Sequence, residues 1–388
     1  MRAVVASAGA SGLPEFAGNT WAFLQYVLGL DRLGVEGFWV DYQAKLDPGK
    51  PAQDRRAQPH EDCHSIEYVD ARFRETARAF GFEGRCCIVY DDGASHFGMS
   101  AEELDDVVTE ADLLLNLGGP LPPESPLLRI PRRAYIDLDP GFTQIWAHQI
   151  DMGFRDYHCF FTIGQNVGRP AFTIPTLGID WMPSFPPIVL DLWPANIDAS
   201  CERLSTIADW HGSQYARFEN ELYAGKREEF IRFIEVPRRA RRPVELALSI
   251  GQHDHEDLGL LLRNDWFVRD PYLYAGDLES YREFIRFSRA EFSVAKGGYI
   301  KSRSGWLSDR TASYLASGKP AVVQSTELEW RLPTGKGLLT FRTVEEAVAA
   351  LEAVEHDYVS HARAAREIAE RHCDSDRVLG SLLERAMP

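Results

Sequence analysis

The chain has 388 residues and a formal net charge of −16, with 45% hydrophobic and 26% charged residues. This composition is that of a globular protein long enough for two domains with separate cores, and it excludes an intrinsically disordered chain. The acidic balance also argues against general binding to nucleic acid or to anionic membranes, because both require basic surfaces.

Further features of the sequence narrow the class of protein. No run of about 18 apolar residues occurs, so we expect no membrane span. The N-terminal segment lacks the apolar centre of a signal peptide. The six cysteines show no CxxC spacing, which argues against structural zinc. We therefore expect a cytoplasmic protein with reduced thiols.

The first half of the chain alternates between short apolar runs and amphipathic segments. The run 3–6 predicts a buried strand, the glycine-containing segment 7–18 a loop, and the segment 20–33 a helix. This order continues through residue 180 and indicates a doubly wound α/β domain over 1–182. We expect its further strands at 37–41, 85–90, 112–117, 133–137 and 159–163, and its further helices at 73–80 and 102–109.

A proline-rich segment separates this domain from a second one. Five prolines between residues 175 and 194 predict an irregular connection, which we place at 183–199. The alternation of strands and helices then restarts and predicts a second α/β domain over 200–388. We expect strands at 201–208, 244–250 and 266–269, and helices at 219–233, 258–262, 281–287, 344–351 and 362–383.

The stretch 288–326 carries the clearest sign of a ligand site. A predicted strand at 291–295 is followed by a basic, glycine-containing loop at 296–304 and by a helix that starts near Gly305. Ser304 and Ser308 are both suited to cap this helix. Because a helix N-terminus attracts phosphate, the unit predicts a phosphate-binding site. Four basic residues lie close to the helix start in the sequence: Lys296, Lys301, Arg303 and Arg310.

Two motifs in this stretch resemble the C-terminal domain of GT-B glycosyltransferases, which bind nucleotide-diphosphate sugars. The turn 305–308, Gly-Trp-Leu-Ser, resembles the Gly-Trp-Asn-Ser turn that many of these enzymes place under the diphosphate. The segment 314–323 resembles their helix end, with its Ala-x-Gly-x-Pro-Val-Val pattern. The stretch also resembles a bacterial group of glycosyltransferase-like proteins with a GWxSDR…YLAxGxP pattern, and that resemblance extends over most of the chain.

The resemblance implies two Rossmann-like domains facing a cleft, with the acceptor in the first and a UDP or dTDP sugar in the second. It also implies that the final helix, at 376–387, crosses back onto the first domain. The ribose-binding glutamate of the family is replaced by Ser313, and Asp309, one helical turn earlier, is the candidate substitute. The implied donor-site residues are Lys296, Arg303, Ser304, Gly305, Trp306, Ser308, Asp309 and Arg310 for the diphosphate and nucleotide, and Gln324, Thr326 and Glu327 for the sugar.

A transferase that inverts configuration also needs a base near the acceptor, which we expect to be a small-molecule hydroxyl or amine. In GT-B enzymes the loop after the first strand lines the acceptor site, and Glu15 is the only titratable side chain of that loop. Asp137, Asp139 and His148 share another strand-end region and are the next candidates. A transferase that retains configuration does not require this base.

No metal or cofactor is expected besides the nucleotide sugar. The cluster 253–256, His-Asp-His-Glu, lacks a third metal ligand at a suitable spacing, and GT-B enzymes generally work without a bound metal. Two other functions stay open: a sugar-nucleotide epimerase of the same fold, to which this cluster would supply acid and base groups, and an inactive GT-B-like partner protein, which Ser313 favours. The expected ligands include no nucleic acid, and a homodimer stays open.

Overall fold

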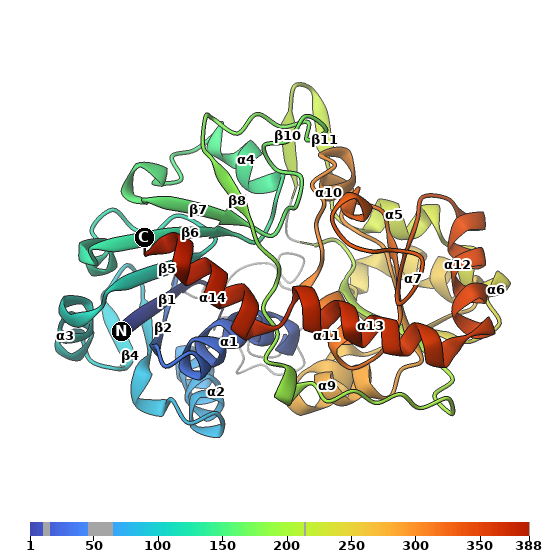
Figure 1. Ribbon diagram of the computed structural model, residues 1–388, viewed down its shortest axis with the longest axis horizontal. Coiled ribbons are helices and arrows are strands. Elements are labelled where there is room, and N and C mark those ends of the chain that lie inside the picture. The colour runs from blue at the N-terminus through green and yellow to red at the C-terminus, as the bar shows by residue number, and fades with distance from the viewer. Residues whose placement is uncertain (11–15, 46–64, 213–214, 388) are drawn as a thin grey trace.

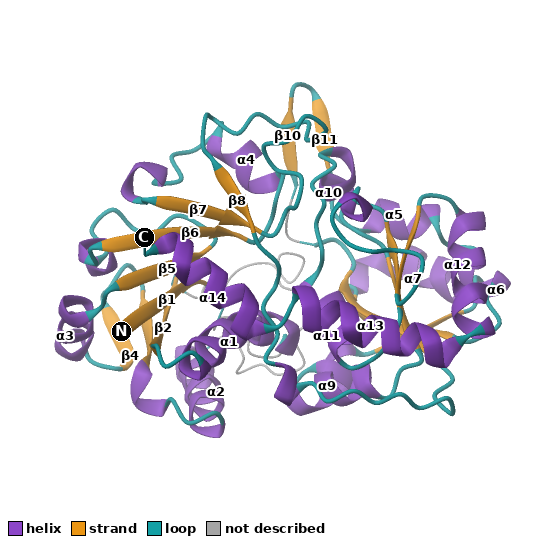
Figure 2. Cartoon of the chain, viewed as in Figure 1, coloured by secondary structure: helices purple, strands orange, loops and turns teal. Residues whose placement is uncertain are grey.

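The computed structural model describes residues 1–10, 16–45, 65–212 and 215–387. It consists of two lobes side by side, each built on a mostly parallel sheet with helices packed on it (Figure 1; Figure 2). The first lobe comprises the described residues between 1 and 183 together with the C-terminal helix, and the second lobe comprises the described residues between 204 and 373. Among the helices of the described ranges, none is long and apolar enough to cross a membrane.

The first lobe contains an eight-stranded sheet in the order β4-β3-β2-β1-β5-β6-β7-β8. All strands are parallel to their neighbours except β4, which pairs antiparallel with β3 at one edge. The central strands are near-continuous apolar runs because helices cover both faces, and Val5 and Leu115 are fully buried. The strands are β1 (Arg2–Ala8), β2 (Glu36–Gln43), β3 (Cys86–Tyr90), β4 (Ser95–Gly98), β5 (Leu113–Leu117), β6 (Arg132–Asp137), β7 (Cys159–Thr162) and β8 (Trp181–Pro183).

Among the predicted helices of the first lobe, the second differs most from the prediction. The second helix begins at Ile66, not at residue 73, because the Ser65 hydroxyl accepts a hydrogen bond from the backbone N–H of Tyr68 and caps it. The short strands β4 and β8 and the short helix α4 were not predicted. The helices are α1 (Ala17–Arg32), α2 (Ile66–Ala79), α3 (Ala101–Glu110) and α4 (Phe142–Ala147), with 3-10 turns η3 (Glu83–Arg85), η4 (Pro126–Arg129) and η5 (Phe154–Asp156).

The second lobe contains a six-stranded parallel sheet in the order β13-β12-β9-β14-β15-β16. Its strands are β9 (Leu204–Asp209), β12 (Val244–Ser249), β13 (Trp266–Arg269), β14 (Ala290–Ser293), β15 (Ala321–Gln324) and β16 (Leu338–Phe341). Its helices are α5 (Arg227–Arg232), α6 (Val236–Arg239), α7 (His255–Arg263), α8 (Pro271–Ala275), α9 (Leu278–Arg286), α10 (Gly297–Lys301), α11 (Asp309–Ala316), α12 (Val344–His356) and α13 (Tyr358–His372), with 3-10 turns η7 (Gln252–Asp254) and η8 (Leu328–Trp330).

The helix predicted at 219–233 was wrong in its first half. Residues Ala216–Phe218 and Glu221–Tyr223 form the antiparallel strands β10 and β11 of a hairpin. Glu219 and Asn220 make its two-residue turn with φ angles of 47° and 66°, a conformation that interrupts a helix and that asparagine tolerates well. The hairpin projects beside α4 of the first lobe (Figure 1), and the backbone carbonyl of Arg217 accepts a hydrogen bond from Gln149 at 2.6 Å.

The chain returns to the first lobe at its end. The segment between the lobes contains η6 (Leu190–Leu192) and the fully buried Trp193, and α14 (Ser375–Ala386) then packs on α1. Arg32 of α1 forms ion pairs with Asp376 of α14 and with Asp191 of the connecting segment, at 2.9 Å and 2.6 Å. The domain boundary predicted at 183–199 stays a prediction.

A matched pair of glycine substitutions tests the packing of α14 on α1. A Cβ atom at Gly29 would lie 2.5 Å from Cδ1 of the buried Leu379, whereas nothing lies within 4 Å of a Cβ atom at Gly380. Alanine gains about 1 kcal/mol of helix propensity at either site, but overpacking costs about 1–3 kcal/mol. We expect denaturant unfolding to show Gly380→Ala above wild type and Gly29→Ala about 1–3 kcal/mol below Gly380→Ala. Equal gains in both variants would contradict this packing.

Candidate functional site

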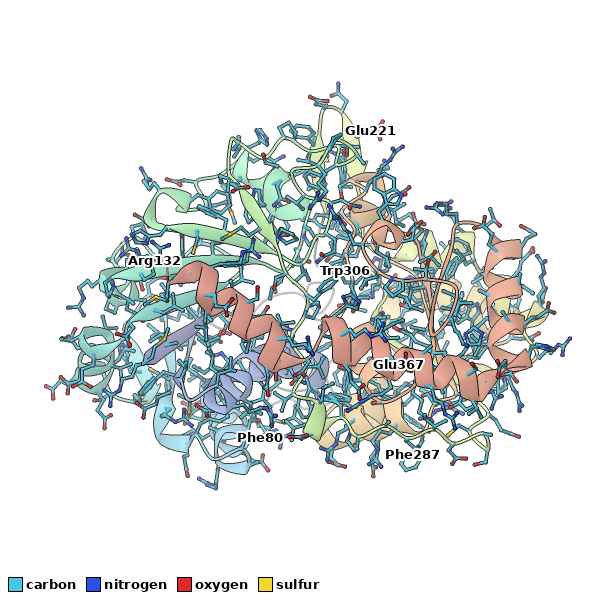
Figure 3. The ribbon with its side chains drawn as sticks, viewed as in Figure 1. Phe80, Arg132, Glu221, Phe287, Trp306 and Glu367 are labelled. Atoms are coloured by element: carbon cyan, nitrogen blue, oxygen red, sulfur yellow. The ribbon has the colours of Figure 1, made fainter. Side chains whose placement is uncertain are left out.

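A cavity of about 520 Å³ lies between the two lobes. Its walls come from the carboxyl ends of β1, β5 and β6 in the first lobe and of β9 and β14 in the second. Loops at the carboxyl ends of parallel strands are the usual ligand sites of open α/β sheets. Figure 3 places Trp306, one of the lining residues, at the junction of the lobes. The arrangement therefore brings both sheets to one site.

The second lobe gives the cavity most of its charged groups. Lys226, Lys296 and Arg310 line it together with the carboxylates of Asp209 and Asp309. The sequence analysis had named Lys296, Asp309 and Arg310 among these and had missed Lys226. The three cations differ in how far their charge is already compensated by neighbouring groups.

The charge of Arg310 is compensated inside the second lobe. Its side chain is buried, and the guanidinium forms an ion pair with the fully buried Glu291 of β14 at 2.8 Å. It also donates to the hydroxyl of Ser293 at 2.6 Å and to the carbonyl of Ile207 at 2.7 Å. These contacts fix α11 to β9 and β14, so Arg310 holds the helix start in place.

Lys226 is the least compensated of the three cations. It exposes 7% of its surface, and within the described residues its ammonium group has no hydrogen-bond partner. Burial, reinforced by the nearby charges of Arg310 and Lys296, holds the pKa of Lys226 well below its ordinary value. A buried lysine in this state has a strong electrostatic preference for an anion in the cavity.

The signal for Lys226 was hidden by the wrong helix prediction. Lys226 directly precedes α5, after Gly225, whose Cβ position lies 1.8 Å from the carbonyl oxygen of His211 and so admits only glycine. A glycine–lysine pair before a helix resembles the loop that was recognised at 296–304. The helix predicted at 219–233 included both Gly225 and Lys226, so Lys226 was not considered as a site residue.

Asp139 connects the two lobes across the cavity. It follows β6, and its carboxylate forms an ion pair with Lys296 at 3.2 Å and accepts a short hydrogen bond from the Tyr299 hydroxyl on α10. Burial, together with this carboxylate, raises the pKa of Tyr299, so the phenol stays protonated as the donor. Lys296 and Asp139, predicted for different roles, are therefore direct partners here.

Asp137 binds the backbone of Asp139 and does not itself line the cavity. It is fully buried, accepts hydrogen bonds from Gln144, Thr162 and the backbone N–H of Asp139 at 3.1, 2.7 and 3.0 Å, and so fixes the start of α4. Burial, only partly offset by these hydrogen bonds, raises the pKa of Asp137 to about 6. Of the two aspartates, Asp139 is the one that faces a ligand.

The raised pKa of Asp137 predicts a dependence of stability on pH. Its folded-state pKa lies above the unfolded value of 3.8, so ionisation is easier in the unfolded chain and stability falls as the pH rises from about 4 to about 6. The difference between the two pKa values corresponds to about 3 kcal/mol. Urea unfolding of wild type and Asp137→Asn across this range should show the wild-type free energy falling relative to the variant, then running parallel above pH 6. Parallel curves throughout would rule out the raised pKa.

The helix near the predicted phosphate site begins later than expected. Gly305 has a φ of +67° and lies in a turn against Asn166, and α11 starts at Asp309 with Ser308 as its cap. The Ser308 hydroxyl accepts from the backbone N–H of Arg310 at 3.2 Å. Ser304 is not the cap, because its hydroxyl donates to the carbonyl of Tyr299. The loop predicted at 296–304 also contains the short helix α10.

Asp309 lies half-buried where α11 meets the cavity. Burial raises its pKa, although the charge of Arg310 acts in the opposite direction. Ser313, at the position of the family's glutamate, donates its hydroxyl to the Asp309 carbonyl at 3.0 Å and lines a small side pocket next to Asp309. Ser313 and Asp309, the predicted substitute for the family's glutamate, therefore lie on the same face of α11.

The other predicted site residues divide into three groups. Trp306 lines the cavity and stacks on Tyr299 at 4.2 Å between ring centroids. Gln324 and Thr326 form contacts within the lobe, because Gln324 donates to Glu229 at 2.7 Å and Thr326 to the Trp306 carbonyl at 2.8 Å. Away from the cavity lining lie Arg303, which is exposed, Glu327, which pairs with Arg342, and His148, which contacts Phe218. Glu15 lies outside the described residues.

The acidic and histidine-rich segment 253–256 forms the end of η7 and the start of α7. Asp254 accepts from the backbone N–H of Gly251 at 3.1 Å and contacts His211 at 2.8 Å. Within the ranges that the structure describes, no three His, Cys, Asp or Glu side chains come close enough together to hold a metal ion.

This two-lobed architecture is the GT-B fold of glycosyltransferases, which confirms the predicted fold class. An alpha-glucosyltransferase in complex with UDP-glucose and DNA containing an abasic site aligns over 100% of both chains, with a TM-score of 0.60 and 12% identity. Anabaena Alr3699/HepE in complex with UDP and glucose aligns over 98% of both chains, with a TM-score of 0.54 and 12% identity. No protein-family model and no curated protein sequence matches the chain.

The buried ion pair between Glu291 and Arg310 predicts a non-additive effect on stability. Arg310→Met leaves Glu291 buried without its partner, which costs about 3–5 kcal/mol, whereas Glu291→Leu together with Arg310→Met removes both charges and recovers most of this loss. Denaturant unfolding of the two single variants and the double variant measures the coupling. As a control, Arg78→Met breaks an exposed pair with Glu83 and should change stability little. Losses that simply add would contradict the coupling.

Proposed function

We propose that this protein is a glycosyltransferase that takes a sugar from a nucleotide-diphosphate donor, in the first instance a UDP sugar, and passes it to an acceptor in the cavity between the lobes. The observation that carries the proposal is Lys226, which is buried, has no hydrogen-bond partner among the described residues and lines this cavity beside Lys296. The structural neighbours support the nucleotide, because they are complexes with UDP or UDP-glucose.

The second lobe holds the donor in this proposal. Lys226 and Lys296 bind the diphosphate, and the backbone N–H groups at the start of α11 add the positive end of the helix dipole. Asp309 accepts hydrogen bonds from the ribose hydroxyls in place of the family's glutamate. Trp306, which lines the cavity, lies closest to the sugar. The role that we assign to Arg310 is to hold the start of α11 through Glu291.

The first lobe presents Asp139 to the acceptor. The acceptor hydroxyl gives its proton to the Asp139 carboxylate while its oxygen bonds to the anomeric carbon of the sugar. The bond from that carbon to the β-phosphate oxygen breaks, and the two lysines stabilise the charge on the departing diphosphate. A diphosphate that enters the cavity competes with Asp139 for Lys296.

Lysine substitutions test the donor site. We expect Lys226→Met and Lys296→Met each to weaken UDP binding about 10- to 100-fold, because each removes a charge-assisted contact with the diphosphate. Lys301→Met is the matched control, since Lys301 pairs with Glu221 at 2.7 Å and does not line the cavity. Calorimetric titration with UDP measures all three. Unchanged affinity in Lys226→Met would remove the main support for the proposal.

Substitution of Asp139 separates chemistry from binding. Asp139→Asn removes the proton acceptor but keeps the size of the side chain, so we expect transfer from UDP-glucose to fall at least 100-fold while UDP binds as tightly as before or tighter. Single-turnover assays and UDP titration measure the two quantities. Full activity in the variant points to a retaining reaction without this base. Conversion of the UDP sugar without any acceptor favours an epimerase, and nucleotide binding without turnover favours an inactive partner.

A further inference from the structure

The two walls of the cavity have opposite chemical character. Every described lysine and arginine that lines it belongs to the second lobe. The first-lobe wall has Asp139 as its single charged side chain among the residues described, and much of the rest of this wall is apolar or aromatic. Its large members are Phe16, Phe23, Leu117, Leu138, Trp146 and Met152.

The neutral polar side chains of the first-lobe wall are already engaged by the protein. The Asn19 amide donates to the carbonyl of Ala10 at 3.3 Å, and the Tyr135 hydroxyl accepts from the backbone N–H of Gly119 at 3.1 Å. The Thr143 hydroxyl is bonded to the buried Asp137. A sugar acceptor needs several hydrogen-bonding groups when it loses water, and among the described residues this wall offers few: the remaining capacity of these three side chains, the Trp146 indole and Asp139.

A phosphate-bearing acceptor fits the first-lobe wall still less well. Nucleic acids and phospholipids need lysine or arginine side chains next to each buried phosphate. The cations of the second lobe are committed to the donor diphosphate in the proposed function or, for Arg310, to Glu291. A nucleic acid or phospholipid would lie against a wall that repels it through Asp139.

We infer that the acceptor is a neutral aromatic compound with a phenolic hydroxyl. This inference rests on the proposed transferase function. Its ring packs on the first-lobe wall beside the half-buried Trp146, with the hydroxyl directed at Asp139. Small residues at the ends of β1 and β5, among them Gly9 and Gly118, leave room for a flat ring. A phenol has a pKa near 10 and gives its proton to a carboxylate more readily than an aliphatic hydroxyl does.

The test offers three acceptors to the full-length protein with UDP-glucose: 4-methylumbelliferone, methyl glucoside and a DNA duplex that contains hydroxymethyluracil. UDP binding is measured separately by calorimetry, and 4-methylumbelliferone binding by its fluorescence. We expect glucosylation of 4-methylumbelliferone alone. We also expect a KM for it at least 10-fold higher in Trp146→Ala, with UDP affinity unchanged. Trp330→Ala is the matched control, because Trp330 is exposed and does not line the cavity.

The outcomes separate the acceptor class from the transferase function. If UDP binds and only methyl glucoside or the DNA is glucosylated, the aromatic class is overturned and the transferase function stands. If UDP binds but 4-methylumbelliferone neither binds nor reacts, the aromatic class is also overturned. An unchanged KM in Trp146→Ala, with transfer to 4-methylumbelliferone intact, overturns the placement of the ring. If UDP does not bind, the proposed function fails first, and the acceptor class fails with it.

Discussion

The structure depends on how positive charge is compensated in the cavity between the lobes. Burying a cation is costly unless an opposite charge lies nearby. Arg310 has this compensation from Glu291, and Lys296 has it from Asp139. Lys226 has no described hydrogen-bond partner, although it is buried. An anionic ligand beside Lys226 offsets the cost of burying this cation, and for this reason we place the diphosphate there.

Contacts between the lobes lie on two sides of this cavity. Asp139 of the first lobe reaches Lys296 and Tyr299 of the second, and the ring of Phe142 on α4 lies against Gly298, where a Cβ atom would approach it to 2.2 Å. On the opposite side of the molecule, Trp21 of α1 donates to the Leu278 carbonyl of α9 at 3.1 Å. These interactions join the lobes at two ends, and the cavity lies between them.

The sequence predicted those strands and helices that are determined by signals in neighbouring residues. Buried strands appear as apolar runs, and the strand, basic loop and helix of the 288–326 stretch follow from glycine, capping and periodicity signals. The two-domain α/β class followed from the same pattern. The hairpin at 216–223 was missed because Glu219 and Asn220 read as helix residues in a charged segment, and this error concealed Lys226.

The pairing of side chains within the site could not be predicted from the sequence. Glu291 alternates with apolar residues and reads as a solvent-facing position of its strand, yet it is fully buried because Arg310, from the following helix, neutralises it. Asp139 and Lys296 are 157 residues apart, and only the meeting of the lobes makes them partners. His148 and Asp139 looked equivalent as candidates, and the fold brings only Asp139 to the cavity.

The most direct test of the central claim is a crystal structure of the protein with UDP bound. The account predicts that the diphosphate lies in the cavity between the lobes, with a phosphate oxygen within hydrogen-bond distance of the Lys226 ammonium group and with Asp139 released from Lys296. A nucleotide bound elsewhere, or a diphosphate in the cavity that leaves Lys226 without a contact, would contradict it.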